Sequence, residues 1–282
     1  MDAILLCMKK RGIRFFRKIK FPTTNVVRFH AKNNFLGLLR TRYDKYDNIL
    51  IMAHGSNNAI LTTTTNLHER FKPYINETDA DAFKDDFVFA VSCLTANEFG
   101  KQCVDKGCIT YLGFQVEIGW LFESNQKLEC KIPNSVATAI DIIIKHIFVE
   151  ELARAYEEFL KSPISVQILK ERFAFAFEKR IAELQDLSVA QVHQKYSVKV
   201  SECHYKVYVT RVILYVLSNL DNVISKLICI GDENYISSSF IRFRKEEGCS
   251  SAEIISELES NPYFEQLKHE EYKCYLREIA TG

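Results

Sequence analysis

The sequence lacks an excess of charge of either sign. Its 282 residues include 37 Lys and Arg and 36 Asp and Glu, so the net charge is +1. A domain that binds nucleic acid or membrane surfaces through electrostatics usually carries a clear basic surplus. The composition therefore gives no support to either role. Hydrophobic residues at 47% and charged residues at 26% are typical of a globular chain with a buried core.

Long hydrophobic runs are also missing. The nearest candidate for a membrane span, residues 208–230, is interrupted by Arg211, Asp221 and Lys226. The apolar run near the N-terminus is too short for a signal peptide, and its basic residues follow the run instead of preceding it. We therefore expect a cytoplasmic protein with no membrane partner.

The familiar cofactor motifs are absent. The sequence has no GxGxxG, GxxxxGK[ST], HExxH or GxSxG pattern, which argues against nucleotide-binding, zinc-protease and serine-hydrolase functions. Its nine cysteines are odd in number and irregularly spaced, and none form a CxxC pair. We therefore expect reduced thiols, with neither a disulfide framework nor a metal site, and no cofactor.

The first 120 residues alternate between strand and helix patterns. Continuous apolar, β-prone runs predict buried parallel strands, and amphipathic segments between them predict covering helices. Thr95 and Glu98 form a capping-box pattern that predicts a helix starting at Thr95 and ending at Gly107. A Thr-rich stretch over 60–65 predicts a small hairpin arm. The expected strands are 3–8, 26–31, 48–53, 87–92 and 108–114, with helices at 34–43 and 95–106.

After Pro133 the pattern becomes helical. Apolar residues recur with a helical period over 134–160, 162–187, 202–230 and 251–259, and Ser250 with Glu253 forms a second capping box. We therefore predict an α/β fold, with a mostly parallel sheet flanked by helices over residues 1–133 and a mainly α-helical region over 134–282.

His54 and Cys93 each follow a strong predicted strand. Because parallel strands end at the same edge of a sheet, this pattern predicts that the imidazole and the thiol lie close together. Cysteine nucleophiles need a base and donors for an oxyanion. Gly55 allows close backbone approach to a substrate, so the N–H groups of Gly55 and Cys93 are the predicted oxyanion donors. The helix expected at Thr95 would favour a Cys93 thiolate.

These residues carry a resemblance to a known family. The segments ILIMAHGS, FVFAVSCLTAN and GCITYLGF resemble the caspase-like (clan CD) cysteine peptidases, in particular the bacterial CHAT and gingipain-like branch. The resemblance covers residues 3–120. It implies a caspase-like sheet and a catalytic dyad without a third catalytic side chain, in which His54 is the base and Cys93 the nucleophile. Relatives often act as effectors in bacterial defence or programmed death.

Two positions depart from the patterns of better-known relatives. Arg- and Lys-cleaving members have Asp two residues before the cysteine, where this chain has Val91, and caspases have Arg-Gly after it, where this chain has Leu94-Thr95. Cleavage specificity therefore does not carry over. Residues after the fifth predicted strand would border the substrate pocket, namely Gln115, Glu117 and Trp120.

A basic run over residues 9–20 (KKRGIRFFRKIK) follows the first predicted strand. A solvated loop is the simpler interpretation. The functional alternative is a contact for an acidic partner. In caspase-like folds the loop after the first strand helps line the substrate groove, so the resemblance implies that Arg14 and Arg17 favour acidic substrate residues.

The sequence thus predicts a cysteine endopeptidase that acts on protein substrates and is controlled by an activating protein, a small-molecule ligand or oligomerisation. The loop over 123–133 is a plausible maturation site. The alternative is a non-catalytic protein-interaction scaffold with the same fold. The two differ in chemistry, because a peptidase has one thiol far more reactive than the other eight.

Overall fold

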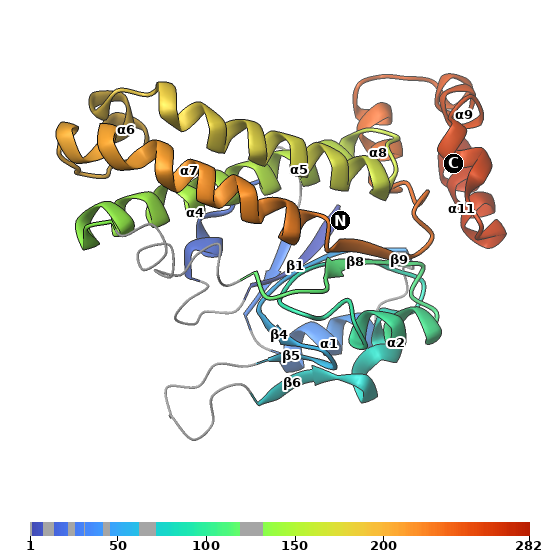
Figure 1. The fold of residues 1–282 in the computed structure, drawn as a ribbon. Coiled ribbons are helices and arrows are strands. Elements are labelled where there is room, and N and C mark those ends of the chain that lie inside the picture. The colour runs from blue at the N-terminus through green and yellow to red at the C-terminus, as the bar shows by residue number, and fades with distance from the viewer. Residues whose placement is uncertain are drawn as a thin grey trace.

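The structure is a computed structural model that describes residues 2–7, 14–21, 26–30, 32–41, 46–61, 72–118 and 132–282. Its centre is a six-stranded sheet in the order β2-β1-β3-β7-β8-β9 (Figure 1). The strands are β1 (Ala3–Cys7), β2 (Val26–Phe29), β3 (Asn48–Met52), β7 (Phe87–Val91), β8 (Thr110–Phe114) and β9 (Leu227–Gly231). The first five are parallel and β9 runs antiparallel to β8, which confirms the predicted mostly parallel sheet.

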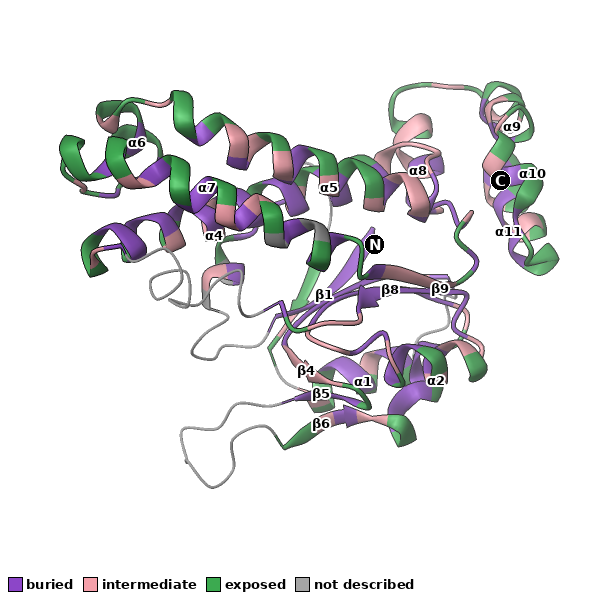
Figure 2. Cartoon of the chain, viewed as in Figure 1, coloured by how far each residue is buried: buried purple, intermediate pink, exposed green. Residues whose placement is uncertain are grey.

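Four of these strands are buried along their whole length. Every residue of β1, β3, β7 and β8 is buried, so apolar side chains are needed on both faces. Figure 2 shows the burial of the sheet between two layers of helices. The continuous apolar runs in the sequence have this physical origin.

Helices cover both faces of the sheet (Figure 1). The short helices α1 (Lys32–Thr41) and α2 (Phe99–Asp105) lie on one face, and the long helices α4 (Asn134–Lys161), α5 (Val166–Ala182) and α7 (Glu202–Ile224) lie on the other. The remaining helical elements are η1 (Arg14–Lys18), η3 (Glu77–Phe83), η5 (Glu183–Asp186), α6 (Val189–Tyr196), α8 (Ser239–Glu246), α9 (Ser251–Glu259), α10 (Pro262–Gln266) and α11 (Glu270–Thr281). The α/β class and the helical C-terminal part are confirmed.

A second, three-stranded antiparallel sheet follows β3 directly. It consists of β4 (His54–Ser56), β5 (Ala59–Leu61) and β6 (Pro73–Asn76). The predicted hairpin arm over 60–65 overlaps β5, while residues 62–65 lie outside the described part of the chain. His54 thus opens the small sheet immediately after the main one ends.

Among the predicted element boundaries that were wrong, two helix ends have a clear physical reason. Helix α2 begins at Phe99 instead of Thr95, because Leu94 takes a left-handed backbone conformation (φ 61°) and the Thr95 hydroxyl donates to the Ser92 carbonyl (3.3 Å). The predicted helix 202–230 ends at Ile224, and the chain continues into β9 because the open edge of β8 supplies backbone partners there. The capping box of Ser250 and Glu253, by contrast, is confirmed at the start of α9.

Helix α7 is long and apolar enough, by length and composition, to cross a membrane. Among the residues that the structure describes it is the one helix that meets this test, and 44% of its most apolar window is buried inside the fold. Val212, Val216 and Leu220 form its fully buried side, and α7 packs against α4 and α5. Packing in the helical layer therefore explains the apolar residues on this side, while Val207 and Leu214 of the same helix are exposed.

The C-terminal region is tied to the strands of the first half. Asn48, in β3, is buried, and its side-chain amide donates to the Asp2 carbonyl (3.1 Å) and to the Ser239 hydroxyl (3.2 Å). Arg242 donates to the Asp2 carboxylate (2.7 Å). The division at residue 133 stays a prediction. These contacts, together with the pairing of β9 with β8, show that both parts share one sheet and one core.

Candidate active site

His54 lies at the carboxyl edge of the main sheet. The backbone N–H of Ala53 donates to the Val91 carbonyl (3.4 Å), so β3 and β7 stay paired up to the point where each ends. His54 comes one residue after that bond, and Cys93 comes two residues after Val91. Both side chains belong to half-buried residues. The two strand ends therefore meet, as the apolar runs predicted.

Gly55 makes the closest approach between the two segments. A Cβ atom placed on Gly55 would lie 2.3 Å from the Cys93 carbonyl oxygen, 2.4 Å from the Ser92 hydroxyl and 2.6 Å from the Thr95 methyl. These distances are shorter than van der Waals contact, and two of the neighbours are buried in the core. Only glycine fits here, because a side chain would push the His54 segment away from Cys93.

The sulfur of Cys93 has a backbone donor. The N–H of Ile118 donates to Cys93 Sγ over 3.4 Å. Ile118 is buried and follows β8, so a third segment of the sheet edge reaches the thiol. A hydrogen bond donated to sulfur favours its negatively charged form over the neutral thiol. This contact is a feature that suits a nucleophile and was not foreseen from the sequence.

Leu94 holds the turn that presents Cys93. Its φ of 61° lies in the left-handed region, which costs a residue with a Cβ roughly 1–2 kcal/mol. Its N–H donates to the Val116 carbonyl (3.2 Å), so this amide is already engaged and is not an oxyanion donor. The strain is offset by this bond and by the next one, from Ala96 N–H to the Phe114 carbonyl (3.2 Å).

The N-terminus of α2 does not stabilise a thiolate at Cys93. The carbonyl of Asn57 accepts from the N–H groups of Glu98 (3.1 Å) and Phe99 (2.8 Å). These bonds direct the first amides of the helix to the β4–β5 turn. The predicted contribution of the helix terminus to a thiolate at Cys93 was therefore wrong, because the helix begins too late in the chain and its amides have other partners.

Asn97 connects the three loops around the site and was missed from the sequence. Its side-chain amide donates to Asn57 Oδ1 (3.0 Å) and to the Gln115 carbonyl (3.1 Å). Asn57 follows β4, Asn97 follows β7 and Gln115 follows β8. Nothing in the local pattern marks Asn97, since its partners lie 40 and 18 positions away.

The structure brings only part of the predicted substrate-binding set to the site. Gln115 is half-buried, its N–H donates to the Lys226 carbonyl (2.9 Å), and it is followed by Glu117, which is exposed. Trp120 lies outside the described residues. Arg14 and Arg17 belong to η1, which packs against α4, and their side chains are not among those described.

Burial disfavours the thiolate form of three other cysteines. Burial raises the pKa of Cys103 and Cys108 well above the usual range, and the Cys108 thiol donates to the Asp86 carbonyl (3.2 Å). Burial also raises the pKa of Cys229 to about 12. Within the described ranges there is no group of three or more His, Cys, Asp or Glu side chains placed to hold a metal ion.

No protein-family model matches the chain. No curated protein matches it significantly in sequence. The functional argument therefore rests on the geometry of the sheet edge.

Proposed function

We propose that this protein is a caspase-like cysteine endopeptidase with His54 as base and Cys93 as nucleophile. The observation that carries the proposal is the contact of Gly55 with Cys93, where a Cβ would lie 2.3 Å from the Cys93 carbonyl oxygen. His54 directly precedes Gly55 in the chain, so it lies next to the residue that packs against the thiol-bearing segment. A base and a thiol presented by neighbouring strand ends are the arrangement that acyl transfer to cysteine requires.

The reaction proceeds in two steps. His54 accepts the thiol proton, and Cys93 Sγ attacks the peptide carbonyl carbon. The tetrahedral intermediate collapses to a thioester as the C–N bond breaks, and the leaving amine takes the proton from His54. Water, deprotonated by His54, then attacks the thioester, releasing the carboxylic acid and restoring the thiol.

In this mechanism, backbone N–H groups stabilise two charged species, the thiolate and the oxyanion. The Ile118 N–H, 3.4 Å from Cys93 Sγ, supports the thiolate before attack. The N–H groups of Gly55 and Cys93 receive the developing oxyanion. The Leu94 amide takes no part, since it is bonded to Val116. Gln115 and Glu117, which follow β8, border the substrate in this proposal, and Trp120, outside the described residues, stays a predicted member of the set.

The biological setting is part of the same proposal. The protein acts in the cytoplasm on protein substrates, and a partner protein, a small ligand or oligomerisation controls it, because an unregulated intracellular protease is harmful. A role as a bacterial defence effector is proposed from the family resemblance of the HGS and SCLTAN segments.

The first experiment compares the reactivity of the thiols. Iodoacetamide labelling at pH 7, mapped by mass spectrometry, is carried out on the native chain, on His54→Ala and on His204→Ala, a control at an exposed histidine of α7. We expect Cys93 to react at least tenfold faster than Cys203 and Cys274, which are exposed. That advantage should disappear in His54→Ala and persist in His204→Ala.

A second experiment tests cleavage itself. A peptide library is incubated with the native chain and with Cys93→Ala, and new termini are identified by mass spectrometry. Cleavage that requires Cys93 supports the peptidase. Equal labelling of Cys93 and the exposed cysteines, together with no cleavage, would favour the non-catalytic scaffold.

A further inference from the structure

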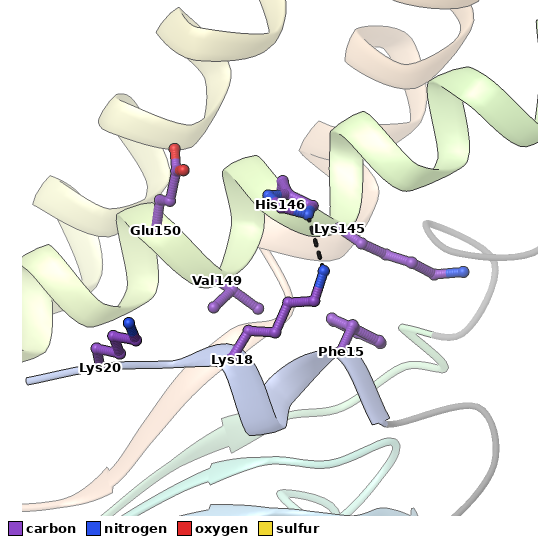
Figure 3. Close-up of a pocket in the computed structure, with 7 residues that line it drawn as sticks. All are labelled: Phe15, Lys18, Lys20, Lys145, His146, Val149 and Glu150. Atoms are coloured by element: carbon purple, nitrogen blue, oxygen red, sulfur yellow. Dashed lines mark hydrogen bonds between the residues drawn. The ribbon is translucent and has the colours of Figure 1, made fainter. Parts of the chain in front are cut away.

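A cavity of about 360 Å³ lies between η1 and α4 (Figure 3). This volume is in the range of pockets that hold small ligands. Phe15 and Val149 supply its apolar walls. Its polar lining consists of Lys18, Lys20, Lys145, His146 and Glu150.

Lys18 points across the cavity to His146, with 3.2 Å between Nζ and Nε2 (Figure 3). Burial and then the positive charge of Lys18 lower the pKa of His146, while Glu150 acts in the opposite direction. At neutral pH the imidazole is therefore uncharged and accepts a hydrogen bond from the ammonium group. The contact with His146 supplies Lys18 with no neutralising carboxylate.

The acidic groups near the cavity are engaged elsewhere. Glu150 forms an ion pair with Arg180 of α5 (3.2 Å), and in Figure 3 its carboxylate points away from Lys18. Asp141 forms an ion pair with Lys145 (2.5 Å). Over the ranges covered by the structure, neither Lys18 nor Lys20 is within ion-pair distance of a carboxylate. The cavity thus presents two uncompensated ammonium groups beside an apolar wall.

We propose that this cavity is a binding site for a small phosphate monoester with an aromatic or other apolar body. A doubly charged phosphate group matches two lysines, which bind phosphate as point charges. Phe15 and Val149 provide the surface for the apolar body. Bound in this way, the ligand joins η1 to α4, because Phe15 and the two lysines come from the η1 segment and Val149 comes from α4.

The test uses phenyl phosphate and the full-length chain, with binding measured by isothermal titration calorimetry. We expect saturable one-to-one binding. Lys18→Ala combined with Lys20→Ala should weaken it at least tenfold. The control pair, Lys101→Ala with Lys106→Ala, removes the same charge from exposed positions on and just after α2 and should change affinity less than twofold. Phenol should bind far more weakly, because it lacks the phosphate.

Several results would overturn the proposal. They are no saturable binding of phenyl phosphate at millimolar concentration, unchanged affinity in the Lys18/Lys20 variant, or an equal loss in the control pair. Thermal unfolding of each variant establishes that it is folded. Co-sedimentation with phosphatidate vesicles tests whether the site binds a lipid headgroup instead of a free phosphate monoester. Lys18-dependent co-sedimentation without binding of free phenyl phosphate would assign the site to a lipid headgroup and overturn the small-ligand assignment.

Discussion

Gly55 and Cys93 are in backbone contact across two segments of the chain, with only 2.3 Å between the Cys93 carbonyl oxygen and the position a Gly55 Cβ would take. The contact brings together the end of β3 and the end of β7. Close packing therefore requires glycine at position 55, and this requirement is separate from the proposed role of Gly55 as an oxyanion donor. The two can be distinguished because stability and thiol reactivity are measured independently.

Gly55→Ala should destabilise the protein and reduce labelling at Cys93. The added methyl group meets backbone and buried atoms that cannot move freely, so we expect a loss of about 1–3 kcal/mol in the free energy of unfolding. Urea denaturation measures it. Gly37→Ala is the matched control, since nothing lies within 4 Å of its Cβ position and it is inside α1. There alanine should stabilise by about 0.5–1 kcal/mol. Equal effects at both sites would contradict the close packing.

Asn97→Ala should loosen the loops around the thiol. Two hydrogen bonds are lost, to Asn57 and Gln115, which corresponds to about 1–3 kcal/mol in the free energy of unfolding. Labelling at Cys93 should slow because the turn that presents it is less well held. Asn33→Ala, at an exposed position of α1, serves as the control and should stay within about 0.5 kcal/mol. If Asn97→Ala leaves stability and Cys93 labelling unchanged, Asn97 does not position the loops around the thiol.

His146 should make folding stability depend on pH on the acidic side of neutrality. Its folded pKa is lowered, by burial first, relative to about 6.5 in an unfolded chain. Below that value the unfolded state binds more protons, so the contribution is fully present above pH 6.5 and is lost as pH falls through the lower folded pKa. His146→Gln should therefore flatten the pH dependence of the unfolding midpoint between pH 7 and 5. An unchanged slope would refute this assignment.

A fragment of residues 1–133 should fail to fold alone. It lacks β9, which pairs with β8, and it lacks the buried aromatic contacts of Phe87 with Phe159 and of Phe89 with Tyr156. Circular dichroism and hydrogen exchange should show no cooperative unfolding and little protection. Co-expression with residues 134–282 should restore both. A fragment that unfolds cooperatively by itself would instead support two independent domains with the boundary near Pro133.

Local patterns were sufficient for the elements whose stability is local or whose burial is complete. The strands β1, β3, β7 and β8 could be predicted because both faces are covered, so their sequences are almost wholly apolar, with Asn48 and Thr110 the polar exceptions at the starts of β3 and β8. The start of α9 followed from Ser250 and Glu253, whose reciprocal hydrogen bonds involve only four consecutive residues. The same type of pattern failed at Thr95, where the left-handed Leu94 and the distant Asn57 carbonyl determine where the helix begins.

The sequence by itself predicted that His54 and Cys93 each follow a buried parallel strand, because continuous apolar runs occur where both faces of a strand are covered. Only the tertiary structure decided how closely Gly55 approaches Cys93, which amide contacts the sulfur, and that residues 227–231 form a strand. Each of those features depends on backbone groups far apart in the chain: Gly55 with Cys93, Ile118 with Cys93, and β9 with β8. Periodicity within a segment carries no information about such partners, since they satisfy hydrogen bonds and packing across the fold.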